Sequence, residues 1–130
     1  MSRAHVVLES GLVLDARSVG APGTALGEMV FTTGMTGYQE AVTDPSYLGQ
    51  ILCFTAPMVG NYGAGPGADE SDRPWPGAVI MARAGDRPGA AGPEGWRSWL
   101  AARGVVAVDD CDTRRASPRG RAGGAPGGGC

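Results

Sequence analysis

The length, composition and charge of this chain limit its class before any motif is considered. It has 130 residues, the length of one ordinary domain, and a formal net charge of −2 at pH 7. A net acidic chain gives no electrostatic footprint for nucleic acid, and no apolar run reaches the roughly 18 residues that cross a membrane. Hydrophobic residues make up 42% of the chain, enough for a core, but 23 glycines and 10 prolines leave much of it outside that core.

The N-terminus and the cysteines indicate the compartment. Residues 1–11, MSRAHVVLESG, carry Glu9 where a signal peptide would continue its apolar stretch. The three cysteines are an odd number and show no CxxC or Cys/His ligand spacing, so they predict neither a disulfide framework nor a zinc site. We therefore expect a cytoplasmic protein with reduced thiols, no metal, no cofactor held by this chain, and no nucleic-acid or membrane partner.

The first part of the chain reads as strands joined by tight turns. Ser10 and Gly11 separate two short apolar runs, 5–9 and 12–18, which together predict a β-hairpin. After a stretch rich in glycine and proline, residues 28–33 alternate their side chains between two faces, the pattern of a half-buried strand.

A short helix and two buried strands follow. Residues 38–44 fit one or two helical turns that stop at Asp44, because the residue before Pro45 is pushed out of the helical region. Residues 50–55 are almost entirely apolar, which is typical of a strand covered on both faces. Another strand, 78–84, lies between segments of Gly, Pro, Ala and charged residues that are expected to be mobile loops.

The main helix is expected at residues 95–103. Trp96, Trp99 and Leu100 recur at helical spacing, and Gly104 stands where a helix of this kind ends. A last strand follows at 105–110. The sequence therefore predicts an α/β fold rich in β-structure: a single compact domain of about six strands with one main helix.

The last residues have a different composition. Residues 115–130, RASPRGRAGGAPGGGC, are almost all Gly, Ala, Pro or Arg. We expect residues 1–114 to form the domain and 115–130 to be a disordered low-complexity tail.

The residues by themselves indicate no catalytic group. The lone histidine, His5, lies in the first strand on a pattern that suggests packing, and Cys53 lies in an apolar strand where a thiol is inert. The acidic stretch 69–73 reads as a solvated loop. The stretch GAGPG at 63–67 lacks the Lys and Ser/Thr of a phosphate-binding loop and precedes no helix.

Three motifs stand in a specific order and spacing: MTGYQE (35–40), TDPSY (43–47) and GNYG (60–63). ESDRP (70–74) and GVVAVDDCDTR (104–114) follow them. Over residues 5 to about 114, this combination resembles the N-terminal domain of the small chain of glutamine-hydrolysing carbamoyl-phosphate synthase. The departures are small, with Gly34 where the family usually carries Ser and Cys111 where an aliphatic residue is more typical.

The resemblance implies a role for the loop motif. In that family, this domain docks on the large synthetase chain and packs against a glutamine amidotransferase domain, and the residue matching Ser46 helps to bind glutamine. Because Pro45 fixes the backbone, a short hydroxyl at this turn can hold a ligand with little entropy to lose. The alternative is structural: Ser46 closes an Asp44-Pro45 turn and has no ligand.

The resemblance does not bring the family's catalytic groups into this chain. The amidotransferase domain of full-length relatives carries a Cys-His-Glu triad on a tight strand-to-helix elbow, and nothing here resembles that elbow. We therefore expect a truncated small subunit that is inactive alone. Its role would belong to carbamoyl phosphate synthesis from glutamine, bicarbonate and ATP in arginine and pyrimidine biosynthesis. The alternative is a non-catalytic binding module that partners the large chain.

The tail suggests an origin for the truncation. After residues 112–114, the family continues into an amphipathic helix, whereas this chain loses the pattern at once. Our hypothesis is that residues 115–130 come from a frameshift or a mispredicted gene end in a GC-rich genome. An intact reading frame through these residues on resequencing would contradict it.

Overall fold

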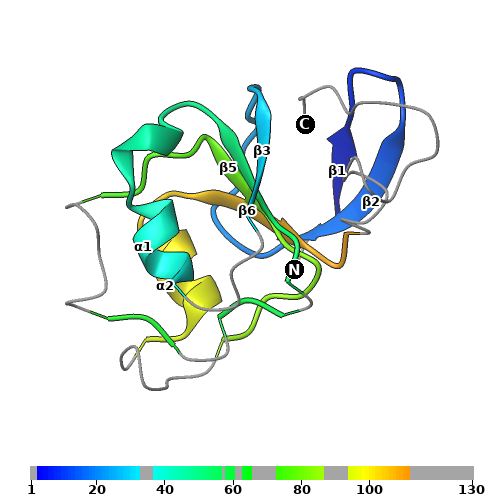
Figure 1. The fold of residues 1–130 in the computed structure, drawn as a ribbon. Coiled ribbons are helices and arrows are strands. Elements are labelled where there is room, and N and C mark those ends of the chain that lie inside the picture. Colours follow the sequence, from blue (N-terminus) through cyan, green and yellow to red (C-terminus); the bar gives the residue numbers. More distant parts are fainter. Residues whose placement is uncertain are drawn as a thin grey trace.

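Two short α-helices lie on one face of a six-stranded mixed sheet (Figure 1). The computed structural model describes residues 3–32, 37–56, 58–60, 63–65, 73–86 and 94–111. The strands are β1 (Arg3–Val7), β2 (Val13–Ser18), β3 (Met29–Thr32), β4 (Ile51–Phe54), β5 (Ala78–Ile80) and β6 (Val106–Asp109). The helices are α1 (Tyr38–Val42), the 3-10 turn η1 (Pro45–Tyr47) and α2 (Trp96–Ala102). The predicted α/β class, with about six strands and one main helix, is confirmed.

The sheet combines a hairpin with a parallel half. Its strand order is β1-β2-β6-β5-β4-β3. β1 pairs antiparallel with β2, and β2 pairs antiparallel with β6, whereas β6, β5, β4 and β3 pair in parallel. Each face has its own apolar cluster: the helices, with Phe54 and Val79, form the first, and β1 and β2, with Ile51 and Ile80, form the second.

The hairpin forms because its turn and its alternation agree. Gly11 has φ +92°, a left-handed conformation that suits glycine at this tight turn. Val6 and Leu14 are register partners and point into the second cluster. The alternate residues point outward, so the expectation that His5 packs in the core is wrong. His5 is exposed, and its Nδ1 lies 3.1 Å from Oδ1 of Asp15 on the neighbouring strand.

The central strands are buried on both faces, as a parallel sheet requires. All four residues of β4 and all three of β5 are buried. In β3 the predicted alternation is confirmed, because Met29 and Phe31 pack on the second cluster and Val30 packs on the first. The fully apolar run at β4 therefore correctly predicted a strand that lies inside the sheet.

The aromatic face of α2 fills the first cluster. Trp96, Trp99 and Leu100 are at most 1% exposed, and the two indole rings stack with centroids 5.3 Å apart. Gly104 follows the helix with φ +73°, which confirms it as the residue that ends the helix. The spacing of the aromatic residues therefore predicted both the helix and its buried face.

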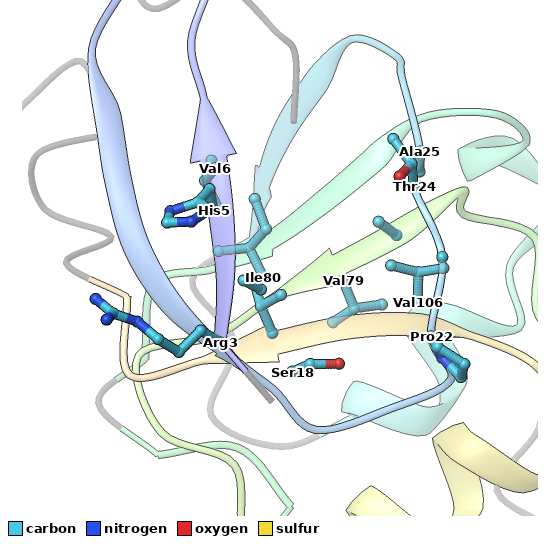
Figure 2. Close-up of a pocket in the computed structure, with 14 residues that line it drawn as sticks. Arg3, His5, Val6, Ser18, Pro22, Thr24, Ala25, Val79, Ile80 and Val106 are labelled. Atoms are coloured by element: carbon cyan, nitrogen blue, oxygen red, sulfur yellow. The ribbon is translucent and has the colours of Figure 1, made fainter. Parts of the chain in front are cut away.

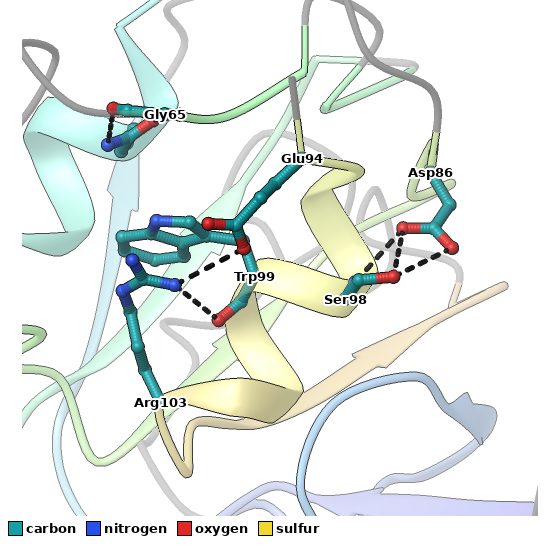
Figure 3. A network of polar contacts seen from close by, with 7 residues as sticks. Gly65, Asp86, Glu94, Ser98, Trp99 and Arg103 are labelled. Carbon is teal, nitrogen blue, oxygen red and sulfur yellow. Dashed lines mark hydrogen bonds and ion pairs between the residues drawn. The ribbon is translucent and has the colours of Figure 1, made fainter. Parts of the chain in front are cut away.

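A side chain from outside the helix caps the start of α2. Asp86 accepts hydrogen bonds from the backbone N–H of Ser98, at 2.9 Å, and from its hydroxyl (Figure 3). The Arg103 guanidinium lies over the Trp99 ring, 4.3 Å from its centroid, and pairs with Glu94 at 3.5 Å. These contacts therefore stabilise the first and last turns of α2.

A buried carboxylate joins the hairpin to the parallel half. Asp109 is fully buried and accepts two hydrogen bonds from the Arg17 guanidinium, both at 2.8 Å. It also accepts the backbone N–H of Ala84 at 2.9 Å. Hydrogen bonding to Asp109 and its charge raise the pKa of Arg17. The carboxylate therefore links β2, β6 and the segment after β5.

Most predicted element ends differ from the observed ones by one or two residues, and the differences at β1 and β5 have a clear local cause. β1 runs over Arg3–Val7 rather than 5–9, because the chain turns at residues 9–11. β5 ends at Ile80, before the predicted end at residue 84, because Ala84 instead bridges Val59. The expected loops at 66–72 and 87–93 and the tail 115–130 lie outside the described residues, and the domain boundary at 114 stays a prediction.

Removing the Trp99 ring tests the packing of α2. Because the ring is 1% exposed, we expect Trp99→Ala to lower the free energy of unfolding by about 3 to 5 kcal/mol. A domain of this size has only about 5 to 15 kcal/mol in total, so the variant should be marginal in urea denaturation. Trp75→Ala, which removes a partly buried ring, is the control and should cost less. A loss below about 1 kcal/mol for Trp99→Ala would contradict the packing.

Candidate functional site

The motif region 37–50 connects β3 to β4 and presents one exposed turn on a fixed base. It begins at Gly37, which precedes α1 with φ +75°, and ends at β4. α1 lies against the first cluster, since Tyr38 and Val42 are at most 3% exposed. The Tyr38 ring meets the Trp96 ring edge-on, with centroids 4.6 Å apart. The base of the site is therefore part of the core.

Two buried polar side chains of α1 hold residues 63–65. Gln39 is 2% exposed, and its Nε2 donates to the carbonyl of Gly65 at 2.7 Å while its Oε1 accepts the Gly65 N–H at 3.0 Å. The Tyr38 hydroxyl donates to the carbonyl of Gly63 at 2.7 Å. A primary amide has both a donor and an acceptor, so Gln39 pairs with both backbone polar groups of Gly65, as a neighbouring strand would. The Tyr38 bond joins the motif MTGYQE to the last residue of GNYG, and the Gln39 bonds hold Gly65 just after it.

The exposed turn follows directly. Asp44 Oδ1 accepts the backbone N–H of Ser46 at 2.9 Å and the Ser46 hydroxyl at 2.8 Å. Pro45 stands at the first position of η1, where its fixed φ fits and its missing N–H is not needed. Tyr47 packs against the first cluster, while Ser46 is exposed. The turn therefore holds its serine at the surface, between the Asp44 cap and the partly buried ring of Tyr47.

Neighbouring backbone fixes both ends of the turn. The N–H of Trp75 donates to the carbonyl of Val42 at 3.1 Å, and the N–H of Gly49 donates to the carbonyl of Trp75 at 3.3 Å. Gly49 has φ +73°, and a Cβ built on the nearby Gly27 would overlap the Gly49 carbonyl. The close approach of these two backbones leaves the turn little freedom to move.

The charge on Asp44 decides what the Ser46 hydroxyl can do. The backbone N–H of Ser46, and then its hydroxyl, hold the pKa of Asp44 below its ordinary value. Asp44 is therefore a carboxylate at neutral pH and accepts a hydrogen bond from the Ser46 hydroxyl. The lone pairs of the Ser46 oxygen remain available, so this arrangement suits Ser46 as a hydrogen-bond acceptor rather than as a donor.

The other sequence candidates lie away from this turn. Cys53 and Cys111 are buried in the second cluster, on the opposite face of the sheet from the cluster that holds Tyr47. His5 is on the outer side of the hairpin. In the described part of the chain, no group of three or more His, Cys, Asp or Glu side chains could hold a metal ion. The structure therefore places Cys53, Cys111 and His5 away from Ser46.

Comparison with known proteins decides the family. The family model described as carbamoyl-phosphate synthase small chain, CPSase domain, matches residues 6–129. The chain belongs to this family.

Several carbamoyl phosphate synthase small chains are similar over most of this chain. The Halobacterium salinarum protein is 47% identical over 114 residues, covering 88% of this chain and 30% of the relative. The Thermosynechococcus vestitus protein is 46% identical over 132 residues, covering 97% and 33%. The Xylella fastidiosa protein is 44% identical over 118 residues, covering 86% and 30%. This chain therefore spans about a third of the length of the curated relatives it matches.

Membership in the carbamoyl-phosphate synthase small-chain family confirms the resemblance drawn from the motifs. The match continues to residue 129, beyond the limit near 114 that the motifs indicated. The frameshift origin of residues 115–130 stays a hypothesis. The role of Ser46 in binding glutamine also stays a prediction.

Sequence reasoning predicted Ser46 as a site residue but missed the side chains that support the turn on which it lies. Gln39 looks like an ordinary surface glutamine on a short helix, and no periodicity marks it as buried. Tyr38 gave a weak signal, because an aromatic residue at the start of a helix usually packs. Within the stretch 63–67, which was not predicted to be a phosphate-binding loop, Gly65 has a structural role as the partner of Gln39.

Replacing Gln39 tests the connection between α1 and Gly65. Gln39→Leu keeps a buried side chain but leaves the N–H and the carbonyl of Gly65 without this partner. An unpaired buried polar group costs about 1 to 3 kcal/mol, so we expect a total loss of about 2 to 4 kcal/mol in denaturation. Hydrogen exchange at the Gly65 amide should accelerate. Glu40→Gln, at an exposed position on the same helix, is the control, and equal stability of the two variants would contradict the role of Gln39.

Titration of Asp44 tests the cap. A carboxylate stabilised in the folded chain contributes stability above its unfolded pKa, and loses it as the pH falls through the folded pKa. We expect a carboxyl ¹³C titration midpoint for Asp44 below 3.8, its ordinary value. Ser46→Ala should raise the midpoint only partly, because the backbone N–H remains. A midpoint that does not move would mean that the hydroxyl does not bond Asp44 in solution.

Proposed function

We propose that this chain forms the N-terminal domain of the small chain of glutamine-dependent carbamoyl-phosphate synthase. In this role it docks on the large synthetase chain and contributes Ser46 to the binding of glutamine. The observation that supports the proposal most strongly is the family match over residues 6–129, together with a surface serine held on a fixed turn within the matched motif. The complex would make carbamoyl phosphate from glutamine, bicarbonate and ATP, for arginine and pyrimidine biosynthesis.

The geometry of Ser46 fits a substrate-holding role. Its hydroxyl proton is engaged by Asp44, and its free lone pairs suit an N–H of glutamine, which carries an ammonium group and a primary amide. The negative charge of Asp44, two residues away, would favour the ammonium group over the carboxylate. Because the turn is fixed before the ligand arrives, binding there would order few groups.

The chemistry of ammonia release requires groups from elsewhere. Amide hydrolysis needs an activated thiolate, a base and donors for the oxyanion. Cys53 and Cys111 are buried among apolar side chains, where a thiolate is disfavoured, and His5 pairs with Asp15 on the hairpin. We infer that the chain is inactive as a glutaminase by itself and holds no cofactor, and that an amidotransferase domain supplies the triad.

A second candidate is a non-catalytic binding module that associates with the large chain. The observation that favours it is that the described residues assemble no cysteine–histidine pair. Neither helix of the described residues has the length or apolar composition to span a membrane. We propose the cytoplasm as the location, where the substrates of either candidate would be found.

Co-purification tests the docking that both candidates share. We expect the tagged chain to retain a carbamoyl-phosphate synthase large chain through affinity and size-exclusion steps. Ser46→Ala should be retained equally, because the proposed role of Ser46 is toward glutamine and not toward the large chain. A chain that is folded by circular dichroism and elutes apart from the large chain would contradict the docking.

Glutamine kinetics test the role of Ser46. The isolated chain should show no glutaminase activity, with or without the large chain. In a small chain that joins this domain to an amidotransferase domain, we expect Ser46→Ala to raise the KM for glutamine about 3- to 10-fold, the value of one hydrogen bond. The kcat should change less, because a substrate-holding bond acts on ground and transition states alike.

A matched serine controls that experiment. Ser98→Ala removes a hydroxyl that hydrogen-bonds Asp86 at the start of α2, far from the Ser46 turn in the sequence, so its KM should match that of the parent. An unchanged KM in Ser46→Ala would return Ser46 to a purely structural role. Thiol-dependent glutaminase activity in the isolated chain would overturn the inference that the triad lies elsewhere.

A further inference from the structure

A cleft of about 380 Å³ opens on the face of the sheet opposite α1 and α2 (Figure 2). Its floor is formed by apolar side chains of two central strands, Ala78 and Ile80 of β5 and Val106 and Val108 of β6. β1 forms one wall, and residues 22–25 form the other. The site has no part in the glutamine turn, which lies on the connection between β3 and β4.

The wall at residues 22–25 is held in place by its neighbours. The N–H of Ala21 donates to the carbonyl of Val105 at 2.7 Å, and a Cβ built on Gly23 would lie 3.2 Å from Cγ2 of Val106. At the other end, Ala25 lies against Gly77, whose Cβ position is 3.7 Å from the Ala25 methyl. The segment is therefore anchored at both ends, and the cleft is formed without a ligand.

The polar groups at the cleft are mostly uncharged. Ser18 lies at one end of the floor and Thr24 on the wall that faces β1 (Figure 2). Within the part of the chain that the structure describes, neither hydroxyl has a hydrogen-bond partner. The two basic residues of β1 in the lining, Arg3 and His5, direct their side chains to Asp15 on β2, at 3.9 and 3.1 Å. A ligand would therefore meet an apolar floor and two free hydroxyls.

We propose that this cleft is a binding site for a small uncharged molecule with a ring-sized apolar body and one hydrogen-bonding group. An apolar cavity of about 150 Å³ takes one benzene ring, so the observed volume suits a bicyclic or branched aliphatic body. Small-molecule sites generally combine such a lining with a few convergent polar groups. The floor spans only two strands between fixed walls, which favours a compact molecule over an extended peptide.

Indole and indene are probes that separate the two parts of the recognition. They share a bicyclic shape, and only indole carries an N–H that Ser18 or Thr24 can accept. We expect indole to shift the methyl signals of Ile80, Val106 and Val108 in ¹³C spectra of the whole chain, with a Kd of about 1 mM. Indene should bind several-fold more weakly. The double variant Ser18→Ala with Thr24→Ala should lose that preference.

Filling the cleft tests its location. Ala25→Leu adds a side chain from the wall and should weaken indole binding at least 10-fold, whereas Ala102→Leu, on the exposed end of α2, should leave it unchanged. Ala78→Leu fills the cleft from the floor and is a second test if Ala25→Leu fails to fold.

Several results would overturn the proposal. Absence of indole-induced shifts up to 10 mM, roughly ten times the expected Kd, is one of them. Equal affinity in Ala25→Leu, Ala102→Leu and the parent is another. Nuclear Overhauser contacts between the floor methyls and residues 112–130 in the free protein would show that the cleft takes a polypeptide segment and not a small molecule.

Discussion

Parallel pairing of β3, β4, β5 and β6 is the constraint from which the rest of the architecture follows. Parallel neighbours cannot be joined by a tight turn, so each connection must cross a face of the sheet. All three connections contribute to the first cluster, through α1, through residues 59 and 64, and through α2. The site and the core are therefore built from the same crossings, and the Ser46 turn is the exposed part of the first one.

The second face is closed by a different element. Among the described residues, the β1–β2 hairpin packs there with Val6 and Leu14 in the same cluster as the central strands, and Ala25 and Cys111 lie beside it. The Arg17–Asp109 pair links this hairpin to β6, the strand with which β2 pairs. A hairpin is narrower than a layer of helices, and the cleft beside residues 22–25 is the space it leaves.

Sequence reasoning predicted most of the fold because its signals were physical ones that the fold also uses. A fully apolar run became the fully buried β4, and the spacing of Trp96, Trp99 and Leu100 became the buried face of α2. It failed where tertiary contacts decide. His5 was expected to pack, but successive residues of a strand point to opposite faces. Val6 points into the core, so His5 points to solvent, beside its register partner Asp15.

The candidate site was predictable only in its exposed part. The turn that holds Ser46 was predicted from Asp44 and Pro45, because aspartate and proline both favour turns, and the structure has a 3-10 turn there. The Gln39 amide that holds Gly65 could not be found, because its partner is 26 residues away and a buried glutamine has no local signature. Long-range polar pairs of this kind require the topology first.

The contacts that fix the Ser46 turn explain why a surface turn carries so specific a sequence. Ser46 contributes little to the core, but its backbone N–H donates a hydrogen bond to Asp44. Its neighbour Tyr47 packs against the first cluster, and the N–H of Gly49 donates a hydrogen bond to the carbonyl of Trp75. A turn needed only to reverse the chain would tolerate more freedom than this, because loop closure depends weakly on loop detail. Rigidity at an exposed hydroxyl is of use when another molecule must meet that hydroxyl in one position, since the group is then oriented before binding. The same reasoning separates the two faces of the domain. The Ser46 turn depends on hydrogen bonds that fix a single polar atom, whereas the cleft depends on apolar shape and two unbonded hydroxyls.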